Sequence, residues 1–351
     1  MAINLFTLHS DMTQSAFVRE SLIAGKLCND YEFTGAKTVK ILTPITVPMS
    51  DYKRSGTSRY GEPTEMQDII QELTLTQDRS FALTIDKGND ADQGYAKNAG
   101  KMLLLQIAER AVPEFDSYVF GKLANKAGII VGNETALSKS NICERISEAT
   151  AVLDDNEVPA YDRMLFVSTQ GYKMLKHSDE FMAVEGLGKE ALAKGIVGSY
   201  DNMQVIKVPA TRWPANVNFM IVHKNAATAP AKMNETKLHK DPPGISGHLL
   251  EGREYYDCFV FAPRACGVYV EVDTGSGKGK ICPAPQITGR GAITCTESSA
   301  KIYYTTDGSD PRYSPTAIQG ANPGVLSKTT VKAYAHMDGM FDSAVSEKTF
   351  E

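Results

Sequence analysis

Residues 98–112 read NAGKMLLLQIAERAV, and the rest of the chain is organised around this stretch. Apolar residues recur every three or four positions, which places them on one face of a helix: Met102, Leu105, Ala108 and Val112. Strong helix formers dominate the stretch. Pro113 lacks an amide hydrogen, so it predicts a kink or a restart. The same spacing then continues to Lys126, and Gly128 is the predicted stop. The pattern therefore predicts a long, bent helix in two segments.

Length and composition limit the class of protein. The 351 residues suffice for two or three domains, and 42% hydrophobic with 23% charged residues is typical of globular chains. A formal net charge of −5 argues against a protein that coats nucleic acid through basic patches. The start, MAINLFTLHSDMTQ, lacks a basic segment followed by an apolar core, so we expect no secretory signal and, without a long apolar run, no membrane span.

Residues with catalytic or metal-binding chemistry are scattered along the chain. The six cysteines show no C-x-x-C spacing, which argues against zinc and predicts reduced thiols in a cytosol. The six histidines include no pair at ligand spacing, and no G-x-S-x-G elbow occurs. Trp213 is predicted to be a packing residue. We therefore expect no catalytic residue, no metal and no cofactor, as in a protein that is not an enzyme.

The region before the helix combines an N-terminal segment with long strands. Residues 10–28 predict an amphipathic helix, which would pack on its own core or reach a neighbouring subunit; the sequence leaves both open. Residues 37–47, KTVKILTPITV, alternate as a strand does, and Pro44 places this strand at a sheet edge or at a bulge. Residues 73–85 continue the alternation as one long strand, or as two joined near residues 77–80.

A polar segment at residues 50–67 separates these strands. It is too long for a hairpin turn, and long insertions of this kind carry function or are disordered. Its notable side chains are three cations and one aromatic residue: Lys53, Arg54, Arg59 and Tyr60.

The region after the helix predicts a mixed α/β domain. Asn141 and Glu144 have the spacing of a capping box at the start of a helix. His239 and His248 flank a Pro-Pro-Gly segment and are predicted to be loop residues. Helices are expected at residues 141–153, 169–177 and 186–194, and strands at residues 163–168, 203–208, 217–222, 254–262 and 267–272.

The last part of the chain differs in character. Residues 273–285, DTGSGKGKICPAP, have the composition of a linker, and they lack the glycine and Ser/Thr positions of a phosphate-binding loop. Residues 286–351 predict short strands at regular spacing, as in a small all-β sandwich. The linker predicts an appended module whose removal leaves the rest of the chain able to assemble.

The sequence IYYTTDGSDP, followed by YSP and VKAYA, resembles the C-terminal immunoglobulin-like module of chitobiases and related hexosaminidases. The resemblance covers residues 286–351 and implies an accessory domain, one with a proposed role in glycan contact. In that family the DGxxP run forms a turn. Asp307 and Asp310 are therefore expected to be structural residues rather than calcium ligands or catalytic groups.

The first 272 residues resemble the major capsid proteins of tailed bacteriophages, which have the Hong Kong 97-like fold, and the match lies in the order of elements. The resemblance implies an α+β chain with an N-terminal arm, an extended β loop, a spine helix, and peripheral and axial domains. The implied division is an arm at 1–36, the loop with peripheral strands at 37–90, the spine helix with the peripheral domain at 91–140, the axial domain at 141–252, closing peripheral strands at 253–272, a linker at 273–285 and the module at 286–351.

This resemblance implies a structural function. Copies of the chain would form hexamers and pentamers of the icosahedral head of a tailed phage, assembled in the bacterial host cytoplasm and found in the virion. The implied partners are scaffolding and portal proteins, DNA held without sequence-specific contacts and, through the outward-facing module, glycans; no membrane is implied. Lys53, Arg54, Arg59 and Tyr60 are the expected inter-subunit contacts. Two alternatives remain open: a glycan-binding surface or secreted protein, and an encapsulin-like compartment shell.

Overall fold

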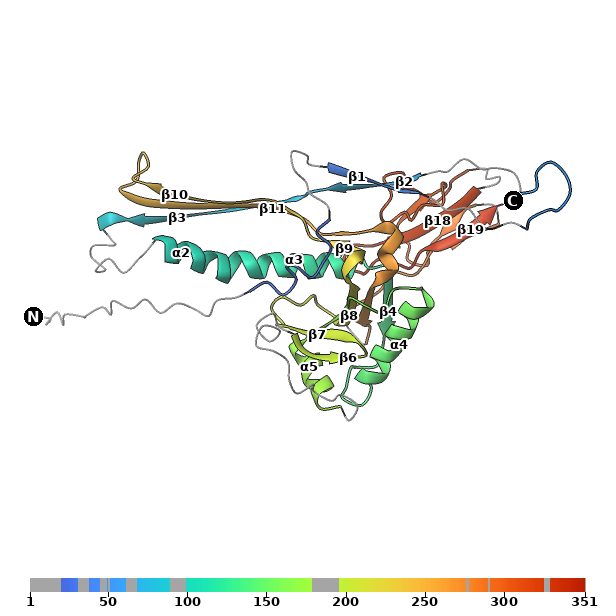
Figure 1. The fold of residues 1–351 in the computed structure, drawn as a ribbon, viewed down its shortest axis with the longest axis horizontal. Coiled ribbons are helices and arrows are strands. Elements are labelled where there is room, and N and C mark those ends of the chain that lie inside the picture. Colours follow the sequence, from blue (N-terminus) through green and yellow to red (C-terminus); the bar gives the residue numbers. More distant parts are fainter. Residues whose placement is uncertain are drawn as a thin grey trace, which may run out of the picture.

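The long helix consists of three consecutive segments: α2 (Ala99–Gln106), a π-helical turn η1 (Ile107–Ala111) and α3 (Val112–Asn125). In the π turn the amide of Val112 bonds to the carbonyl of Ile107, five residues earlier. Pro113 follows directly and has no amide hydrogen to donate to the helix. The π turn therefore lies where the regular series of α-helical hydrogen bonds is interrupted. The predicted interruption near Pro113 is confirmed as this π turn, but the predicted bend is wrong, because the computed structural model shows the three segments as one straight rod (Figure 1).

The structure describes residues 20–30, 38–44, 49, 51–60, 68–88, 99–178, 196–275, 278–289, 291–324 and 329–350. The expected helix at 186–194, the first half of the expected N-terminal helix and the start of the long helix lie outside these residues. Within them, none of the helices is long and apolar enough to cross a membrane.

Gly128 has a different role from the predicted helix stop. The helix already ends at Asn125, and Gly128 is not among the residues with a positive φ angle. A Cβ atom at position 128 would lie 2.1 Å from the carbonyl oxygen of Ala265. The glycine is therefore required by the close approach of two backbone segments.

A six-stranded sheet packs against the C-terminal half of this rod. Its strand order is β4-β13-β8-β5-β7-β6. Both faces are covered, which explains why β5 and β8 are apolar without alternation: Met164 and Phe166 belong to the core shared with α3, while Leu165 and Val167 belong to the core shared with α4 and α5. The elements are β4 (Ile129–Asn133), α4 (Ile142–Asp155), β5 (Arg163–Ser168), α5 (Thr169–Lys176), β6 (Ile196–Tyr200), β7 (Met203–Val208), β8 (Val217–His223) and β13 (Val268–Asp273).

The capping box predicted at the start of α4 is wrong. Asn141 occupies the N-cap position, but its side chain makes no capping hydrogen bond. It accepts from the amide of Ser138 at 2.8 Å and donates to the carbonyl of Ala136 at 3.1 Å. The Asn141 side chain therefore stabilises the loop before α4 instead of capping the helix.

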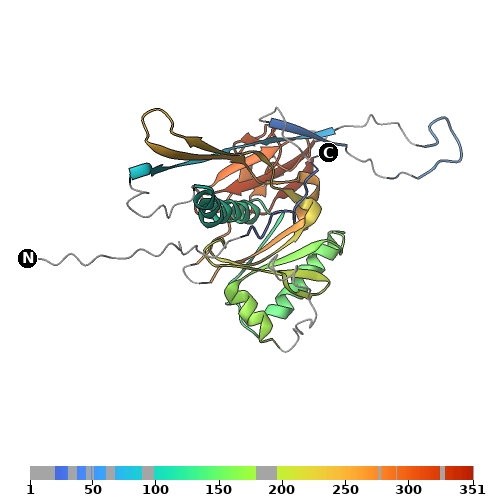
Figure 2. The same ribbon diagram turned by 60° about the vertical axis from the view of Figure 1, so that its left-hand side comes forward.

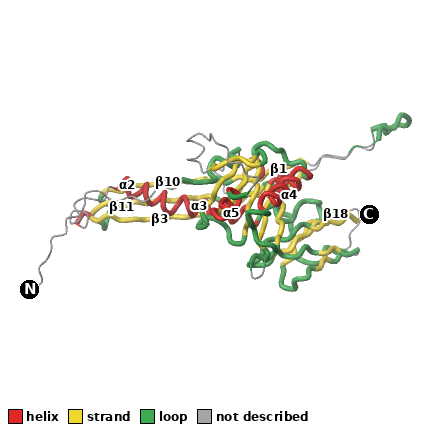
Figure 3. Tube along the Cα trace, turned by 90° about the horizontal axis from the view of Figure 1, so that it is seen from below, coloured by secondary structure: helices red, strands yellow, loops and turns green. Residues whose placement is uncertain are grey.

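A long three-stranded sheet runs beside the helical rod, with the order β10-β11-β3 (Figures 1 and 3). Its strands are β3 (Gln77–Asp86), β10 (Ala231–Lys240) and β11 (Gly247–Tyr256). His239 and His248 lie on strands of this sheet, so their prediction as loop residues is wrong. The expected domain boundary at residue 252 falls within β11, where Gly252 pairs with Phe81.

The predicted strands before the helix form a hairpin, β1 (Thr38–Pro44) with β2 (Asp68–Thr74). Pro44 is the last residue of β1 in a two-stranded sheet, so its expected edge position is confirmed. A break at residues 75–76 separates β2 from β3, which selects the two-strand alternative, but the junction predicted near residues 77–80 is wrong because these residues lie within β3. The root of the hairpin is anchored, because Gln71 donates to the Val260 carbonyl at 2.8 Å and accepts from the Ala262 amide at 2.9 Å.

Residues 20–28 form a turn, so the expected helix is wrong over this part. Ser21 explains the turn, because its hydroxyl accepts from the amides of Ile23 and Ala24 and offers the backbone an alternative to helical bonds. Ile23 and Leu27 are buried in the core of the same subunit. Of the two open alternatives, packing on its own core holds for this segment.

Asp116 is a buried carboxylate on the inner face of α3. Its side chain is fully buried and lies 2.6 Å from Nη1 of Arg212. It also accepts from the Ser21 hydroxyl at 2.6 Å and from the Leu22 amide at 3.0 Å. One carboxylate thus joins the helix, the N-terminal turn and the loop after β7.

Asp257 forms a second buried junction, between β11 and the short strand β12 (Phe259–Val260), which pairs with β9 (Ala227–Thr228). It accepts from the Tyr118 hydroxyl at 2.7 Å, and from the Thr76 amide and hydroxyl at 2.9 and 2.7 Å. Burial, more than the neighbouring carboxylate, raises the pKa of Tyr118 above its ordinary value, so the phenol remains a donor. This junction ties the helix to the break between β2 and β3.

The C-terminal module has the expected all-β structure. A four-stranded sheet, ordered β17-β16-β18-β19, accompanies a two-stranded sheet of β14 and β15. Ile293, Tyr304, Val331 and Ala333 form its core. The strands are β14 (Gln286–Ile287), β15 (Ile293–Thr294), β16 (Lys301–Thr305), β17 (Ile318–Gln319), β18 (Thr329–His336) and β19 (Ser346–Phe350).

We expect Asp116→Ala to lower the free energy of unfolding by about 3–5 kcal/mol, because it leaves Arg212 buried without its counter-ion. Glu114→Ala is the matched control: Glu114 is two residues away on the same helix and pairs with Arg79 at the surface, so its loss should be under about 1 kcal/mol. Denaturant titration of the unassembled subunit measures both, and equal losses would contradict this role of Asp116.

Candidate assembly interface

Residues 51–60 form a compact turn at the end of the β1–β2 hairpin. The amide of Lys53 bonds to the carbonyl of Arg59 at 2.9 Å, and Arg59 Nε reaches the Gly56 carbonyl at 3.3 Å. The rings of Tyr52 and Tyr60 meet edge to face at 5.0 Å. The structure thus brings Lys53, Arg59 and Tyr60 together in one turn, and Arg54 lies on the same turn. We refer to residues 51–60 as the tip.

The tip is exposed and positively charged. All ten residues are exposed, and Tyr60 is 86% exposed. Lys53 and Arg54 have no ion-pair partner among the described residues. Three cations accompany one carboxylate, Asp51, so the rest of the chain carries all of the net negative charge. Charged surface of this kind suits contact with an acidic partner surface.

The tip lies away from the body of the subunit in both ribbon views (Figures 1 and 2). The hairpin between root and tip also presents an apolar pair to solvent, since Leu42 and Ile70 are cross-strand neighbours and are 61% and 40% exposed. By contrast, Leu73 and Leu75 at the root are buried. The hairpin therefore has an anchored root, and its tip is exposed to solvent.

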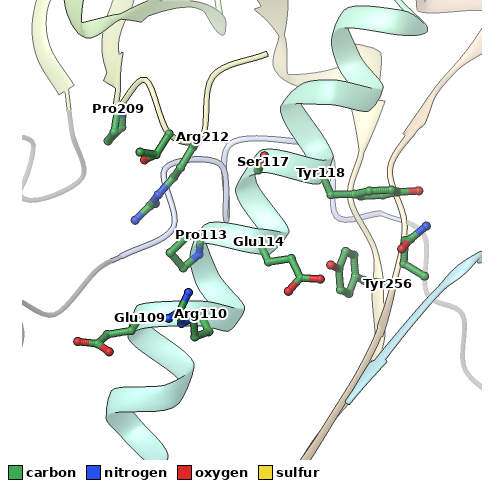
Figure 4. Close-up of a pocket in the computed structure, with 11 residues that line it drawn as sticks. Glu109, Arg110, Pro113, Glu114, Ser117, Tyr118, Pro209, Arg212 and Tyr256 are labelled. Atoms are coloured by element: carbon green, nitrogen blue, oxygen red, sulfur yellow. The ribbon is translucent and has the colours of Figure 1, made fainter. Parts of the chain in front are cut away.

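An open groove of about 800 Å³ follows the helix at the π turn. One face of the helix forms its floor, and Pro209 with Arg212 on one side and Tyr256 on the other form its walls (Figure 4). The floor residues are Glu109, Arg110, Pro113, Glu114, Ser117 and Tyr118. Arg212 is held by Asp116 and Glu114 by Arg79, so the polar groups in the walls and floor have fixed positions.

The composition of the groove is that of a contact surface. Within the described ranges, no cluster of three or more His, Cys, Asp or Glu side chains could hold a metal ion. The groove is open and mixes both signs of charge with apolar rings, a composition suited to an extended polypeptide.

A further interface lies within the chain, between the module and the end of α3. Arg312 donates to the carbonyls of Ala127 and Gly128, both at 3.0 Å, and Tyr313 donates to the Lys126 carbonyl at 2.8 Å. These carbonyls follow the helix C-terminus, where a cation is favourable. Asp310 holds the guanidinium at 2.8 Å, and the Arg312 side chain is 8% exposed.

A second contact reinforces this docking. Lys126 bonds to the buried carboxylate of Asp342 at 2.9 Å, and His336 Nδ1 lies 2.6 Å from the other oxygen of that carboxylate. Ile281, Tyr313 and Phe341 pack against the core that contains α3. Since Cys282 also bonds to the Phe341 carbonyl, the expected linker at 273–285 is packed against module and body. The described part of the predicted linker is therefore held by backbone hydrogen bonds, whereas assembly of the chain without the module stays a prediction.

The turn at Asp307 is structural, as expected. Its carboxylate accepts from the Ser309 amide at 3.0 Å and from the Thr316 hydroxyl at 2.7 Å. Burial disfavours the ionised form, but these hydrogen bonds outweigh burial and hold the pKa of Asp307 below its ordinary value.

Sequence reasoning missed the buried junctions. Asp116 lies on the same helical face as Val119, Phe120 and Leu123, so a carboxylate within an apolar stripe was a usable signal. Nothing in the local pattern around Asp257 or Arg312 indicates that their partners are more than a hundred residues away. Trp213 is a packing residue as predicted, with its indole bonded to the Val217 carbonyl at 2.7 Å.

Comparisons with known proteins agree with this architecture. A family model described as "Fn3 associated" matches residues 292–350. No curated protein matches the sequence. A structure from Mycobacterium phage Che8 is 18% identical, with 78% of this chain and 100% of that chain covered at a TM-score of 0.58.

Two further solved structures are similarly related. The capsid structure of cyanophage P-SCSP1u is 12% identical, with coverages of 78% and 94% and a TM-score of 0.61. The mature capsid of bacteriophage PhiM1 is 12% identical, with coverages of 78% and 92% and a TM-score of 0.59. These likenesses establish the α+β Hong Kong 97-like fold that the order of elements predicted, followed by a C-terminal immunoglobulin-like module.

We expect Arg312→Ala to lower stability by about 2–4 kcal/mol and to increase hydrogen exchange in the last turn of α3, because the helix end loses its bound cation. Lys301→Ala, at an exposed site on the same module, is the matched control and should change neither quantity. Removal of the module after Gly275 should destabilise the body in the same way. Unchanged exchange in α3 on loss of Arg312 would contradict the docking role.

Proposed function

We propose that this chain is the major capsid protein of a tailed bacteriophage and that its copies assemble into the icosahedral head that encloses the DNA. The single observation that carries the proposal is the fold, shared over 78% of the chain with structures described as phage capsids. The role is structural and non-enzymatic, and the protein belongs to the virion after assembly in the bacterial cytoplasm.

The parts of the fold then take distinct roles. The N-terminal segment is the arm, the β1–β2 hairpin is the extended loop, α2–α3 is the spine helix, and the six-stranded sheet with α4 and α5 is the axial domain. The three-stranded sheet of β3, β10 and β11 belongs to the peripheral domain. We therefore move the start of the closing peripheral strands from residue 253 to β10, because β10 and β11 pair with β3.

Contacts between copies follow from the exposed surfaces. We assign the tip, with Lys53, Arg54, Arg59 and Tyr60, to the body of a neighbouring subunit in the same or an adjacent hexamer or pentamer. The support is its charge, opposite in sign to that of the rest of the chain, and its distance from its own body. The groove at the π turn is a suitable surface for an extended segment of a neighbour.

The remaining partners follow from the same role. A chain with a net charge of −5 suits a container that holds DNA without gripping it or reading its sequence. Scaffolding and portal proteins are further partners that this role implies. The module faces outward in this arrangement, where it is able to meet glycans, and its docking on α3 fixes its orientation.

Expression of the full chain, sedimentation and electron microscopy test the proposal. The expected result is closed shells of uniform size. Persistent monomers at high concentration would contradict it and favour a glycan-binding protein. Shells that enclose an enzyme instead of DNA in the native host would also contradict it and favour a compartment protein.

We expect the double variant Lys53→Glu and Arg54→Glu to reduce the yield of shells at least tenfold while the subunit stays folded. Neither side chain has an ion-pair partner within the described part of its own subunit, so the change acts on contacts between copies. Lys301→Glu, an exposed cation on the module, is the control and should assemble normally. Analytical ultracentrifugation measures the shell fraction, and normal assembly of the tip variant would contradict its assigned role.

A further inference from the structure

Two cysteines of the module meet where the chain enters it. Cys282 lies in the entering segment, and Cys295 directly follows β15. The thiol of Cys295 points at the carbonyl oxygen of Pro283, 3.5 Å away and one residue from Cys282. Cys295 is also among the neighbours that raise the pKa of Cys282. The two side chains are therefore neighbours where the chain enters the module.

The backbone holds the two cysteines in place from both sides. The Cys282 amide bonds to the Phe341 carbonyl at 2.9 Å, and Ile281 forms an isolated parallel β-bridge with Phe341. On the other side, β15 pairs with β14, with Thr294 opposite Gln286. Both segments are thus held beside each other by backbone hydrogen bonds.

The two thiols differ in their access to solvent. Cys282 is 2% exposed, whereas Cys295 is partly exposed. Burial first, and then the neighbouring Cys295, raise the pKa of Cys282 to about 11. Cys295 is therefore the side chain that a small disulfide reaches first, and Cys282 is the one that completes the bond.

None of the other four cysteines offers an equivalent pair. Cys143 meets the Ser178 hydroxyl at 3.0 Å, and Cys28 meets the Asp30 carboxylate at 3.2 Å. Cys258 is buried, and Cys266 packs beside the core of α4 and α5.

We propose that Cys282 and Cys295 form a dithiol site that closes to a disulfide when the protein leaves a reducing environment. The oxidant is a low-molecular-weight disulfide such as oxidised glutathione. Cys295 attacks it, forms a mixed disulfide and releases one small thiol; Cys282 then displaces the second small thiol as the Cys282–Cys295 bond forms. The protein loses two hydrogen atoms and two electrons, and the small disulfide is reduced to two thiols.

The bond would tie the entering segment to β15 and so fix the module that docks on α3. The time at which the disulfide forms rests on the proposed function: it would form after particles leave the reducing host cytoplasm. The chemistry itself does not depend on particle formation, so the proposal is testable on unassembled subunits and its failure is distinguishable from failure to assemble.

Trypsin makes the site easy to read, because cleavage at Arg290 separates the two cysteines into the peptides 281–290 and 291–301. The full chain is incubated with oxidised or reduced glutathione, the remaining thiols are alkylated in denaturant, and the peptides are analysed by mass spectrometry. The expected result is a linked pair of these peptides in the oxidised sample only. Recovery of both peptides separately, alkylated or carrying glutathione, would overturn the proposal.

Matched variants and a stability measurement complete the test. Cys295→Ser should abolish the linked species, whereas Cys266→Ser, at another partly exposed cysteine, should leave it intact. Oxidation should raise the unfolding midpoint of the module by roughly 5–10 °C in the wild type and leave that of Cys295→Ser unchanged. Cross-linked peptides between Cys282 and any cysteine other than Cys295 would count against a built site.

Discussion

The carboxylate of Asp116, buried on the inner face of the long helix, is the contact on which the rest of the structure depends. A charge removed from water must be paired and fully hydrogen-bonded, and Arg212, Ser21 and the Leu22 amide meet that requirement. Because these partners come from the N-terminal turn and from the loop after β7, the carboxylate fixes three distant segments at once. Asp257 repeats this arrangement with Tyr118 and Thr76 on the other side of the helix.

The module and the β1–β2 hairpin differ in how they contact the rest of the subunit. Directly after the C-terminal end of α3, Arg312 and Tyr313 of the module bind the carbonyls of Ala127 and Lys126. The module is thus part of the folded subunit, although its sequence resembles a free accessory domain. The hairpin, in contrast to the module, is held at one end only: its root is anchored through Gln71 and its tip is exposed. An exposed projection of this kind offers surface for contact with a neighbouring molecule.

The elements that could be predicted from the sequence are those set by the local spacing of apolar residues. The period of the helix, the buried strands β5 and β8 and the alternating β1 follow from the spacing of apolar residues, so their positions were predictable. The turn at Ser21 and the missing cap at Asn141 could not be predicted, because a short polar side chain can hydrogen-bond to several nearby backbone groups. Pairing of β10 with β11 was obscured by the polar sequence of an exposed strand. The tip residues were predicted from loop length and charge, whereas the docking of Arg312 depends on a contact across 185 positions.

We infer that the projection of one subunit completes the surface of another. A cryo-electron microscopy reconstruction of assembled particles, at a resolution that shows side chains, would test this arrangement. Arg54 and Tyr60 are expected to lie against a neighbouring subunit, and residues 286–350 on the outer surface, still bound to the end of α3. A tip folded back on its own subunit, or a module detached from that helix, would contradict it.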